Sequence, residues 1–159
     1  MGTVYNYFQR KPALFTHVLA SGRSESLRVS AALAKDPPRD PVEAISQILM
    51  AQMRGANRHD KELWRVIHAT APLEPEAFGL DYFMVKEQFK DHITLLLDTL
   101  RDRGQLRRDI DIDMAAKTIT YIASEVFRRY VIDDHRSLES AIGELKAMMN
   151  FVVGLAIAD

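Results

Sequence analysis

The fold of this chain is decided by the stretch FGLDYFMVKEQFKDHITLLLDTLRDRG, residues 78–104. Large apolar residues recur in it every three or four positions over about six turns, the spacing that places them on one face of an α-helix. The stretch ends at Gly104, a residue type that readily closes a helix in the left-handed conformation. The pattern predicts a long amphipathic helix with an apolar face of Phe78, Tyr82, Val85, Phe89, Ile93, Leu96 and Leu100.

The segments before this stretch have the same periodicity. Early apolar residues predict a helix that ends before Asp36, because the two prolines that follow cannot continue it. Asp40 then stands where its side chain can cap a new helix, with Pro41 at the first helical position and Glu43 placed for a capping box. A short helix is expected at residues 60–69, before the next proline-rich break.

Two further helices close the chain, and Asp111 and Ser137 stand where they can cap them. The last helix is apolar on more than one face, and small residues lie among its large ones. It is either a central helix of a single-chain core or a helix shared with a two-fold partner. We favour the second interpretation, which predicts a homodimer through the helices near residues 112–132 and 138–157.

Composition restricts the class of protein. The 159 residues suffice for one domain, and 47% apolar with 27% charged residues is typical of a globular chain. The absence of cysteine excludes disulfides and thiolate chemistry. No apolar run approaches the roughly 18 residues of a membrane-spanning helix, and the start lacks a signal-peptide pattern. We therefore expect a cytoplasmic protein with no membrane partner.

Charge is distributed unevenly along the chain. Residues 1–35 carry a net charge of +4 and the remainder −5, which gives the overall −1. A basic amino end on a mildly acidic body suits a protein that contacts a polyanion with one end only. A chance excess of charge on a solvated helix is the alternative.

The opening residues carry a more specific signal. A glycine–threonine pair, two aromatic residues spaced two apart, a phenylalanine and a lysine follow one another in GTVYNYFQRK, residues 2–11. This order resembles the end of the helix-turn-helix of the TetR (tetracycline-repressor) family of transcriptional regulators. The segment GQLRRDID at 104–111, with Ala115 and Ala116 behind it, looks like that family's junction before its dimerisation helices. The resemblance spans the chain but is specific only at its start.

The resemblance implies an all-α helical bundle of the TetR ligand-binding and dimerisation type, with a partial helix-turn-helix stub at the amino end. Residues 1–35 would be the remnant of the DNA-reading motif with its connecting helix, and residues 36–159 the ligand-binding and dimerisation domain. In the family, such positions contact the backbone phosphates of operator DNA; here they are Thr3, Tyr5, Tyr7 and Lys11. An aromatic cluster that only anchors the amino end to the body is the alternative.

The resemblance also implies a function, with one departure from the family. The family's reading motif has two helices before the one that residues 2–11 resemble, and a recognition helix alone is marginal in water. We therefore expect a ligand-responsive DNA-binding transcriptional regulator, a repressor by analogy with the family, whose chain as written binds operator DNA weakly or not at all. The alternative is a stand-alone small-molecule-binding dimerisation module that does not bind DNA.

Aromatic, methionine and a few polar residues gather in the helices that enclose the effector pocket of the resembled family. Apolar walls with a few polar groups are what small-molecule sites need, although each such residue can equally belong to an ordinary core. We expect a small hydrophobic or amphipathic effector in a pocket lined by Met53, Trp64, His68, Phe83, Tyr121 and Glu125.

The sequence lacks the motifs of metal binding, nucleophilic catalysis and phosphate binding. No histidine pair has the three-to-five spacing of a helical metal site, and neither HExxH, GxSxG nor a phosphate-binding glycine loop occurs. The carboxylates at Asp109, Asp111 and Asp113 lie at an expected helix start, where capping and the helix dipole explain them. We expect no enzyme, no catalytic residues, no metal and no cofactor.

Overall fold

A computed structural model of the chain describes residues 27–57, 60–70, 72–73 and 75–157. Residues 27–35 are helical, and the labelled helices that follow are α3 (Pro41–Ala56), α4 (Lys61–Thr70), α5 (Pro75–Asp102), α6 (Ile112–Ile132) and α7 (Leu138–Gly154). The extended pairing found within these ranges is one isolated bridge between Leu106 and Ile157. The prediction of an all-α fold is confirmed.

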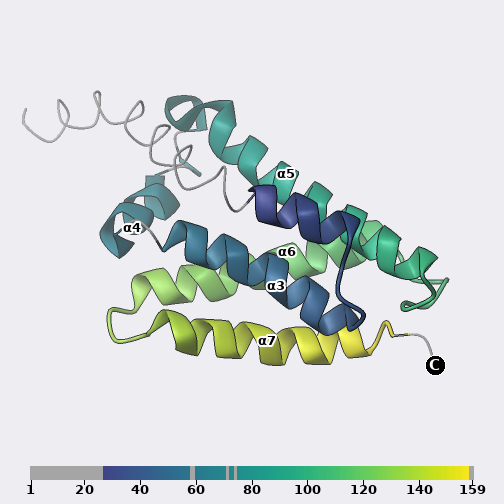
Figure 1. Cartoon of the computed structure of the whole chain (residues 1–159). Coiled ribbons are helices and arrows are strands. Elements are labelled where there is room, and N and C mark those ends of the chain that lie inside the picture. The colour runs from purple at the N-terminus through teal and green to yellow at the C-terminus, as the bar shows by residue number, and fades with distance from the viewer. Residues whose placement is uncertain (1–26, 58–59, 71, 74, 158–159) are drawn as a thin grey trace, which may run out of the picture.

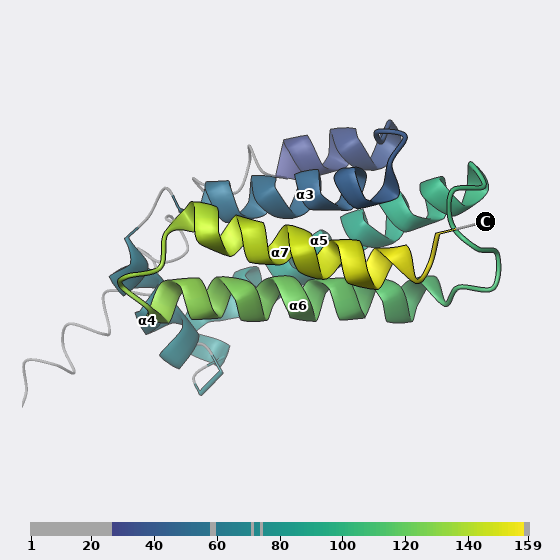
Figure 2. The same ribbon diagram turned by 90° about the horizontal axis from the view of Figure 1, so that it is seen from below.

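The helices form a bundle around α3, α6 and α7. The consecutive helices α6 and α7 lie side by side and antiparallel, and α7 lies between α6 and α3 (Figure 2). The long α5 crosses the bundle in contact with both α3 and α6, and the short α4 packs against one end of α6 (Figure 1). This arrangement brings four helices, α3 to α6, together at the end of the bundle where α4 lies.

Side-chain caps fix three of the helix starts as the sequence predicts. Each cap accepts a hydrogen bond from a backbone N–H in the first turn, which would otherwise have no partner. The pairs are Asp40 with Val42 at 2.9 Å, Asp111 with Met114 at 3.0 Å and Ser137 with Ser140 at 3.1 Å. Glu43 does not close a capping box in the described structure, because its carboxylate accepts from the Gln47 amide at 2.9 Å.

Gly104 ends α5 as the sequence predicts. Its φ of +73° lies in the left-handed region, which side chains with a Cβ adopt at a cost. The N–H of Gly104 donates to the Arg101 carbonyl and that of Gln105 to the Leu100 carbonyl, both at 2.9 Å. This pattern satisfies carbonyl groups at the helix end and turns the chain towards α6.

The core is continuous from the first described helix to α7. Its fully buried residues include Ile45, Ile48 and Leu49 of α3 and Leu96 and Leu100 of α5. Truncating one such leucine to alanine typically costs about 2–5 kcal/mol, because the cavity left behind closes only partly. Ala34 belongs to the same cluster, so the helix at 27–35 packs onto the bundle.

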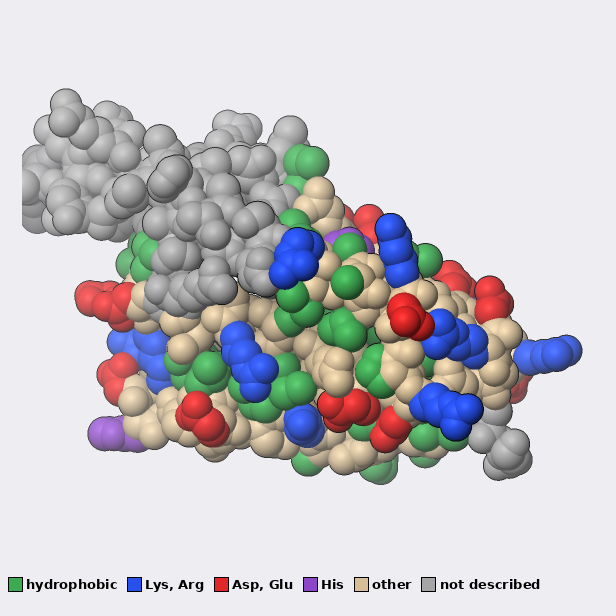
Figure 3. Space-filling model, viewed as in Figure 1, with side chains coloured by type: hydrophobic (Ala, Val, Ile, Leu, Met, Phe, Trp, Pro, Cys, Tyr) green, Lys and Arg blue, Asp and Glu red, His purple; other side chains and the backbone are tan. Residues whose placement is uncertain are grey.

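Charges of both signs are interspersed with apolar side chains over the face drawn in Figure 3. Several of the ion pairs found lie within one helix, such as Lys117 with Asp113 and Arg101 with Asp98. Such pairs contribute little to stability. Among the described helices, none is long and apolar enough to cross a membrane.

Candidate functional site

A cavity of about 140 Å³ lies where α3, α4, α5 and α6 meet. Apolar side chains make most of its wall. On α3 these residues follow helical spacing, so a single face of that helix is presented to the cavity. The apolar lining residues are Leu49, Met53 and Ala56 of α3, Trp64 of α4, Phe89 of α5, and Ala123 and Phe127 of α6.

Three aromatic rings form a tight group at one side of the cavity. Trp64 meets Phe127 edge-on, with ring centroids 5.3 Å apart and planes at 86°. His68 lies 5.9 Å from Phe127 and 6.3 Å from Trp64. The indole N–H of Trp64 donates to the Ala56 carbonyl at 2.8 Å, which fixes the ring's orientation. The wall is therefore preorganised, with ring edges and faces available to a planar guest.

Polar groups at the cavity leave hydrogen-bonding capacity unused. Gln52, His68, Lys86 and Ser124 belong to its lining. Within the described part of the chain, the buried Nε2 atoms of Gln52 and His68 have no hydrogen-bond partner. Buried polar atoms are nearly always paired, so two unpaired nitrogens at one cavity indicate groups that a bound molecule can satisfy.

Two cations act on the histidine of the cavity wall. Burial, together with the positive charges of Lys86 and Arg128, lowers the pKa of His68 to about 4. The imidazole is therefore neutral at pH 7. Among the described lining residues there is no aspartate or glutamate. The nearby carboxylate of Glu125 is held by Arg128 through hydrogen bonds of 2.8 and 2.7 Å.

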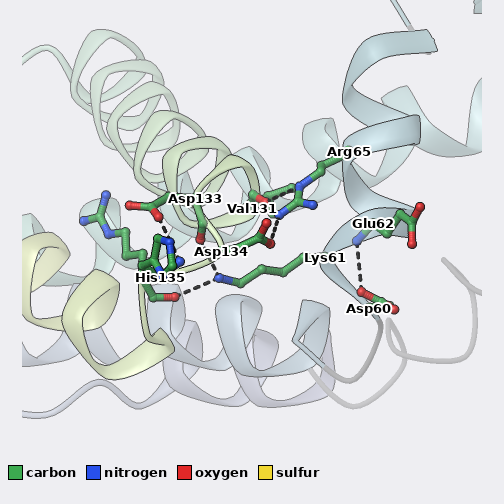
Figure 4. A network of polar contacts seen from close by, with 9 residues as sticks. Asp60, Lys61, Glu62, Arg65, Val131, Asp133, Asp134 and His135 are labelled. Atoms are coloured by element: carbon green, nitrogen blue, oxygen red, sulfur yellow. Dashed lines mark hydrogen bonds and ion pairs between the residues drawn. The ribbon is translucent and has the colours of Figure 1, made fainter.

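The first half of α4 contacts the end of α6 and the α6–α7 loop (Figure 4). Lys61 donates to the carbonyls of Asp133 at 2.8 Å and Arg136 at 2.7 Å, and its ammonium lies 4.1 Å from the centre of the Tyr130 ring. Arg65 donates to the Val131 carbonyl at 2.8 Å and forms an ion pair with Asp134. The Arg65 hydrogen bond holds the pKa of Asp134 below its usual value.

These contacts follow from the helical period of α4. Lys61, Trp64, Arg65 and His68 follow one another at intervals of three and one residues, so all four lie on the side of α4 that faces α6. The same short helix thus lines the cavity and holds the loop between α6 and α7. If a ligand in the cavity shifted α4, the contacts of Lys61 and Arg65 with that loop would change as well.

The predicted pocket residues separate into three groups. Met53, Trp64 and His68 line the cavity. Tyr121 and Glu125 are not among the lining residues: Tyr121 is 72% exposed, and Glu125 lies on the surface bound to Arg128. Phe83 lies in α5, and its side chain is outside the described residues.

The difference has a physical cause. Helix α6 has an inward side, whose apolar residues meet both the core and the cavity, and an apolar stripe exposed to solvent, and periodicity alone does not say which of the two meets a neighbour. The polar lining residues that the sequence did not indicate, Gln52 and Ser124, each stand beside an apolar lining residue. Leu49, Gln52, Met53 and Ala56 follow one another at the three- and four-residue spacing of one helix face. This spacing is the sequence signal that could have identified the α3 side of the cavity.

A second feature is an exposed apolar surface on α6 and α7. On α6, Met114 is 58%, Tyr121 72% and Ile132 53% exposed, at positions that share one face of the helix. On α7, Phe151 and Leu155 are 71% and 65% exposed, in register with the exposed small residues Gly143 and Ala147. On the same face of α6 the exposed ion pair of Glu125 with Arg128 lies between Tyr121 and Ile132. Exposed large apolar residues gathered on two neighbouring helices are candidates for an interaction surface.

The predicted DNA-contacting residues Thr3, Tyr5, Tyr7 and Lys11 lie outside the described residues. Within the described ranges, no group of three or more histidine, aspartate or glutamate side chains could hold a metal ion. Comparisons of the chain with models of known families, with curated proteins and with solved structures find no match. The assignment of function rests on the two sites themselves.

Proposed function

We propose that this chain is the ligand-binding and dimerisation part of a ligand-responsive transcriptional regulator of the TetR type. The observation that carries the proposal is the dual role of α6, which lines the cavity with Phe127 and exposes an apolar stripe around Tyr121 on another face. A protein that responds to a ligand through a change in its dimer needs both a ligand cavity and a dimer interface on the same element. The resemblance of residues 2–11 to a DNA-reading motif suggests that the response is a change in DNA binding.

The cavity is the proposed effector site. It is mainly apolar, lies between helices and has a few polar groups that can orient a guest, which are the usual properties of small-molecule sites. Its floor on α3 belongs to the buried core, so the site is held by rigid elements. Effector and operator binding would weaken each other by the same factor, since coupling between two sites is reciprocal.

The exposed surface of α6 and α7 is the proposed dimer interface, and its occupant is a second copy of the chain. The two helices already pack against each other, so a two-fold axis beside them would build a four-helix interface from two pairs. Phe151 and Tyr121 supply large apolar area, and Gly143 lets another helix approach closely, because nothing lies within 4 Å of where its Cβ would be.

The mass of the chain in solution tests the interface. We expect light scattering to give twice the monomer mass of 18.1 kDa, and the double variant Tyr121→Glu/Phe151→Glu to give a monomer with unchanged helical content, because both side chains are exposed in the single chain. The matched control is Leu95→Glu, at a residue 44% exposed on α5. A monomeric wild type, or a double variant that remains dimeric, would contradict the proposed interface.

Operator binding separates the regulator from the alternative, a dimerisation module without DNA. Selection from a random pool of DNA duplexes by the full gene product should enrich a palindrome, since a two-fold dimer reads two equivalent half-sites. Lys11→Ala should weaken binding to all sequences alike, because a phosphate contact carries no base information. A dimer that enriches no sequence would support the module.

A further inference from the structure

We infer that the cavity between α3, α4, α5 and α6 binds a small aromatic monocarboxylate, with its ring against Trp64 and Phe127 and its carboxylate towards Gln52 and His68. This inference deepens the proposed function and rests on the cavity being its effector site. It follows from the size of the cavity, the shape of its wall, its unused hydrogen-bond donors and the sign of its charge.

The volume of the cavity fits a single ring with a short substituent. The cavity measures about 140 Å³. An engineered apolar cavity of about 150 Å³ is filled by one benzene molecule. A fused two-ring system or a long acyl chain would have to extend out of this space or displace the wall, and the α3 part of that wall belongs to the buried core.

The wall favours a flat aromatic guest over an aliphatic one. The edge-on arrangement of Trp64 and Phe127, 5.3 Å apart, leaves ring surface that a third ring can meet in the same geometry. The Trp64 hydrogen bond to Ala56 prevents the indole from rotating to fill the space itself. The wall therefore need not reorganise when a ring enters.

The polar groups favour an acceptor. The amide nitrogen of Gln52 can only donate, and the neutral imidazole of His68 can donate from Nε2. A carboxylate has two oxygens and accepts from several donors at once, so one such group can satisfy both nitrogens. An ammonium group in the same place can only donate, so it could not accept the hydrogen bond of the Gln52 amide nitrogen, which would stay unpaired.

The charge distribution favours an anion. Lys86 lies in the lining, its charge and that of Arg128 both act at His68, and the described lining contains no acidic side chain. A carboxylate entering this field is attracted, while an ammonium ion is repelled. Hydrogen bonds to a charged acceptor are also stronger than those to a neutral one.

Trp64 provides the readout, because it is the chain's one tryptophan and part of the cavity wall. Its fluorescence is followed during titration of the full-length chain with benzoate, benzamide, benzylamine and octanoate at pH 7. We expect benzoate to bind about tenfold or more tightly than benzamide, the difference expected for charge-assisted hydrogen bonds, and benzylamine not to bind.

Two variants locate the contacts. Gln52→Leu keeps a similar volume and His68→Phe keeps a ring, and each should weaken benzoate about tenfold while leaving benzamide within a few-fold of its wild-type affinity. Ala123→Leu, which fills part of the cavity, should abolish binding of all the ring compounds. If benzamide or benzylamine binds as tightly as benzoate or more tightly, the inference that the ligand carries a carboxylate is wrong. If Ala123→Leu binds benzoate as the wild type does, the inference that the ligand lies in this cavity is wrong.

The experiments distinguish a wrong ligand class from a wrong proposed function. Binding of octanoate in place of benzoate, by a chain that is dimeric, would overturn the aromatic carboxylate and leave the regulator in place. If none of the four probes changes the fluorescence or the thermal unfolding midpoint, the inferred ligand class is wrong. A monomeric wild type would contradict the proposed function, whatever the probes do.

Discussion

At the scale of single residues, His68 is the side chain whose properties depend most on its surroundings. It is a half-buried histidine whose neighbours Trp64 and Phe127 are aromatic and whose Nε2 atom lacks a described partner. The charged groups acting on it are Lys86 from α5 and Arg128 from α6, the latter paired with Glu125. Both cations disfavour the protonated imidazole.

This environment makes stability depend on pH. The pKa of His68 is about 4 in the folded chain against 6.5 in an unfolded one, so the unfolded chain binds the proton more tightly between these values. The contribution of the neutral ring is complete above about pH 6.5 and is lost as the pH falls towards 4. We expect a loss of about 2 kcal/mol, less than the full shift implies because solvent screens part of the ring.

Urea unfolding between pH 4 and pH 7 measures this effect. The His68→Phe variant should lose about 2 kcal/mol less than the wild type over that interval, since phenylalanine has no proton to bind. His135→Phe is the matched control, because His135 is exposed on the α6–α7 loop. Identical pH dependence in the wild type and His68→Phe would show that the imidazole is not buried as described.

At the scale of elements, α4 depends on its contacts with other helices. It has ten residues, too few for an isolated helix to be stable in water. Of its side chains only Ile67 is fully buried. Polar contacts to the α6–α7 loop therefore make up much of its attachment, with Lys61 bound to two backbone carbonyls.

Removing the Lys61 ammonium should destabilise the chain more than removing an ordinary surface charge. We expect Lys61→Met to cost about 1–2 kcal/mol, because two carbonyls lose a charged donor and the Tyr130 ring loses a cation. The control, Lys117→Met, removes an exposed pair with Asp113 and should cost about 0.5 kcal/mol or less. Denaturant midpoints measure both, and equal costs would mean that the α4 contacts are ordinary surface pairs.

The helix boundaries show how far local sequence determines an element. Asp40, Asp111, Ser137 and Gly104 each act within a few residues of their own position, so their roles could be predicted without any tertiary information. The capping box at Glu43 was not found, because the Gln47 amide one turn further on competes for the same carboxylate.

At the scale of the whole molecule, the cavity and the exposed apolar surface lie on different faces of α6. Phe127 and Ser124 contact the cavity space, while Tyr121 and Ile132 are exposed to solvent. A ligand that moves α6 or α4 alters the surface that the second copy would meet. In thermodynamic terms, ligand affinity then differs between the monomer and the dimer.

A comparison of the dimer with its monomeric variant tests this coupling. Benzoate affinity, read from Trp64 fluorescence, should differ about fivefold or more between the wild type and Tyr121→Glu/Phe151→Glu, although neither substituted residue lines the cavity. By reciprocity, saturating benzoate should change the dimer dissociation constant by the same factor. Leu95→Glu should behave like the wild type. Equal affinities would mean that the two sites act independently.

The sequence by itself determined the helices, their order and most of their ends, because helical periodicity, capping and proline breaks are local properties of the chain. Met53, Trp64 and His68 could be predicted as cavity residues, since each follows the apolar spacing of its helix. Only the tertiary structure decided that Tyr121 and Glu125 lie on the surface, and that Gln52 and Ser124 replace them at the cavity. The reason is physical: α6 has apolar residues on two sides, and which side meets a neighbour is set by the packing of α4, α5 and α7 around it.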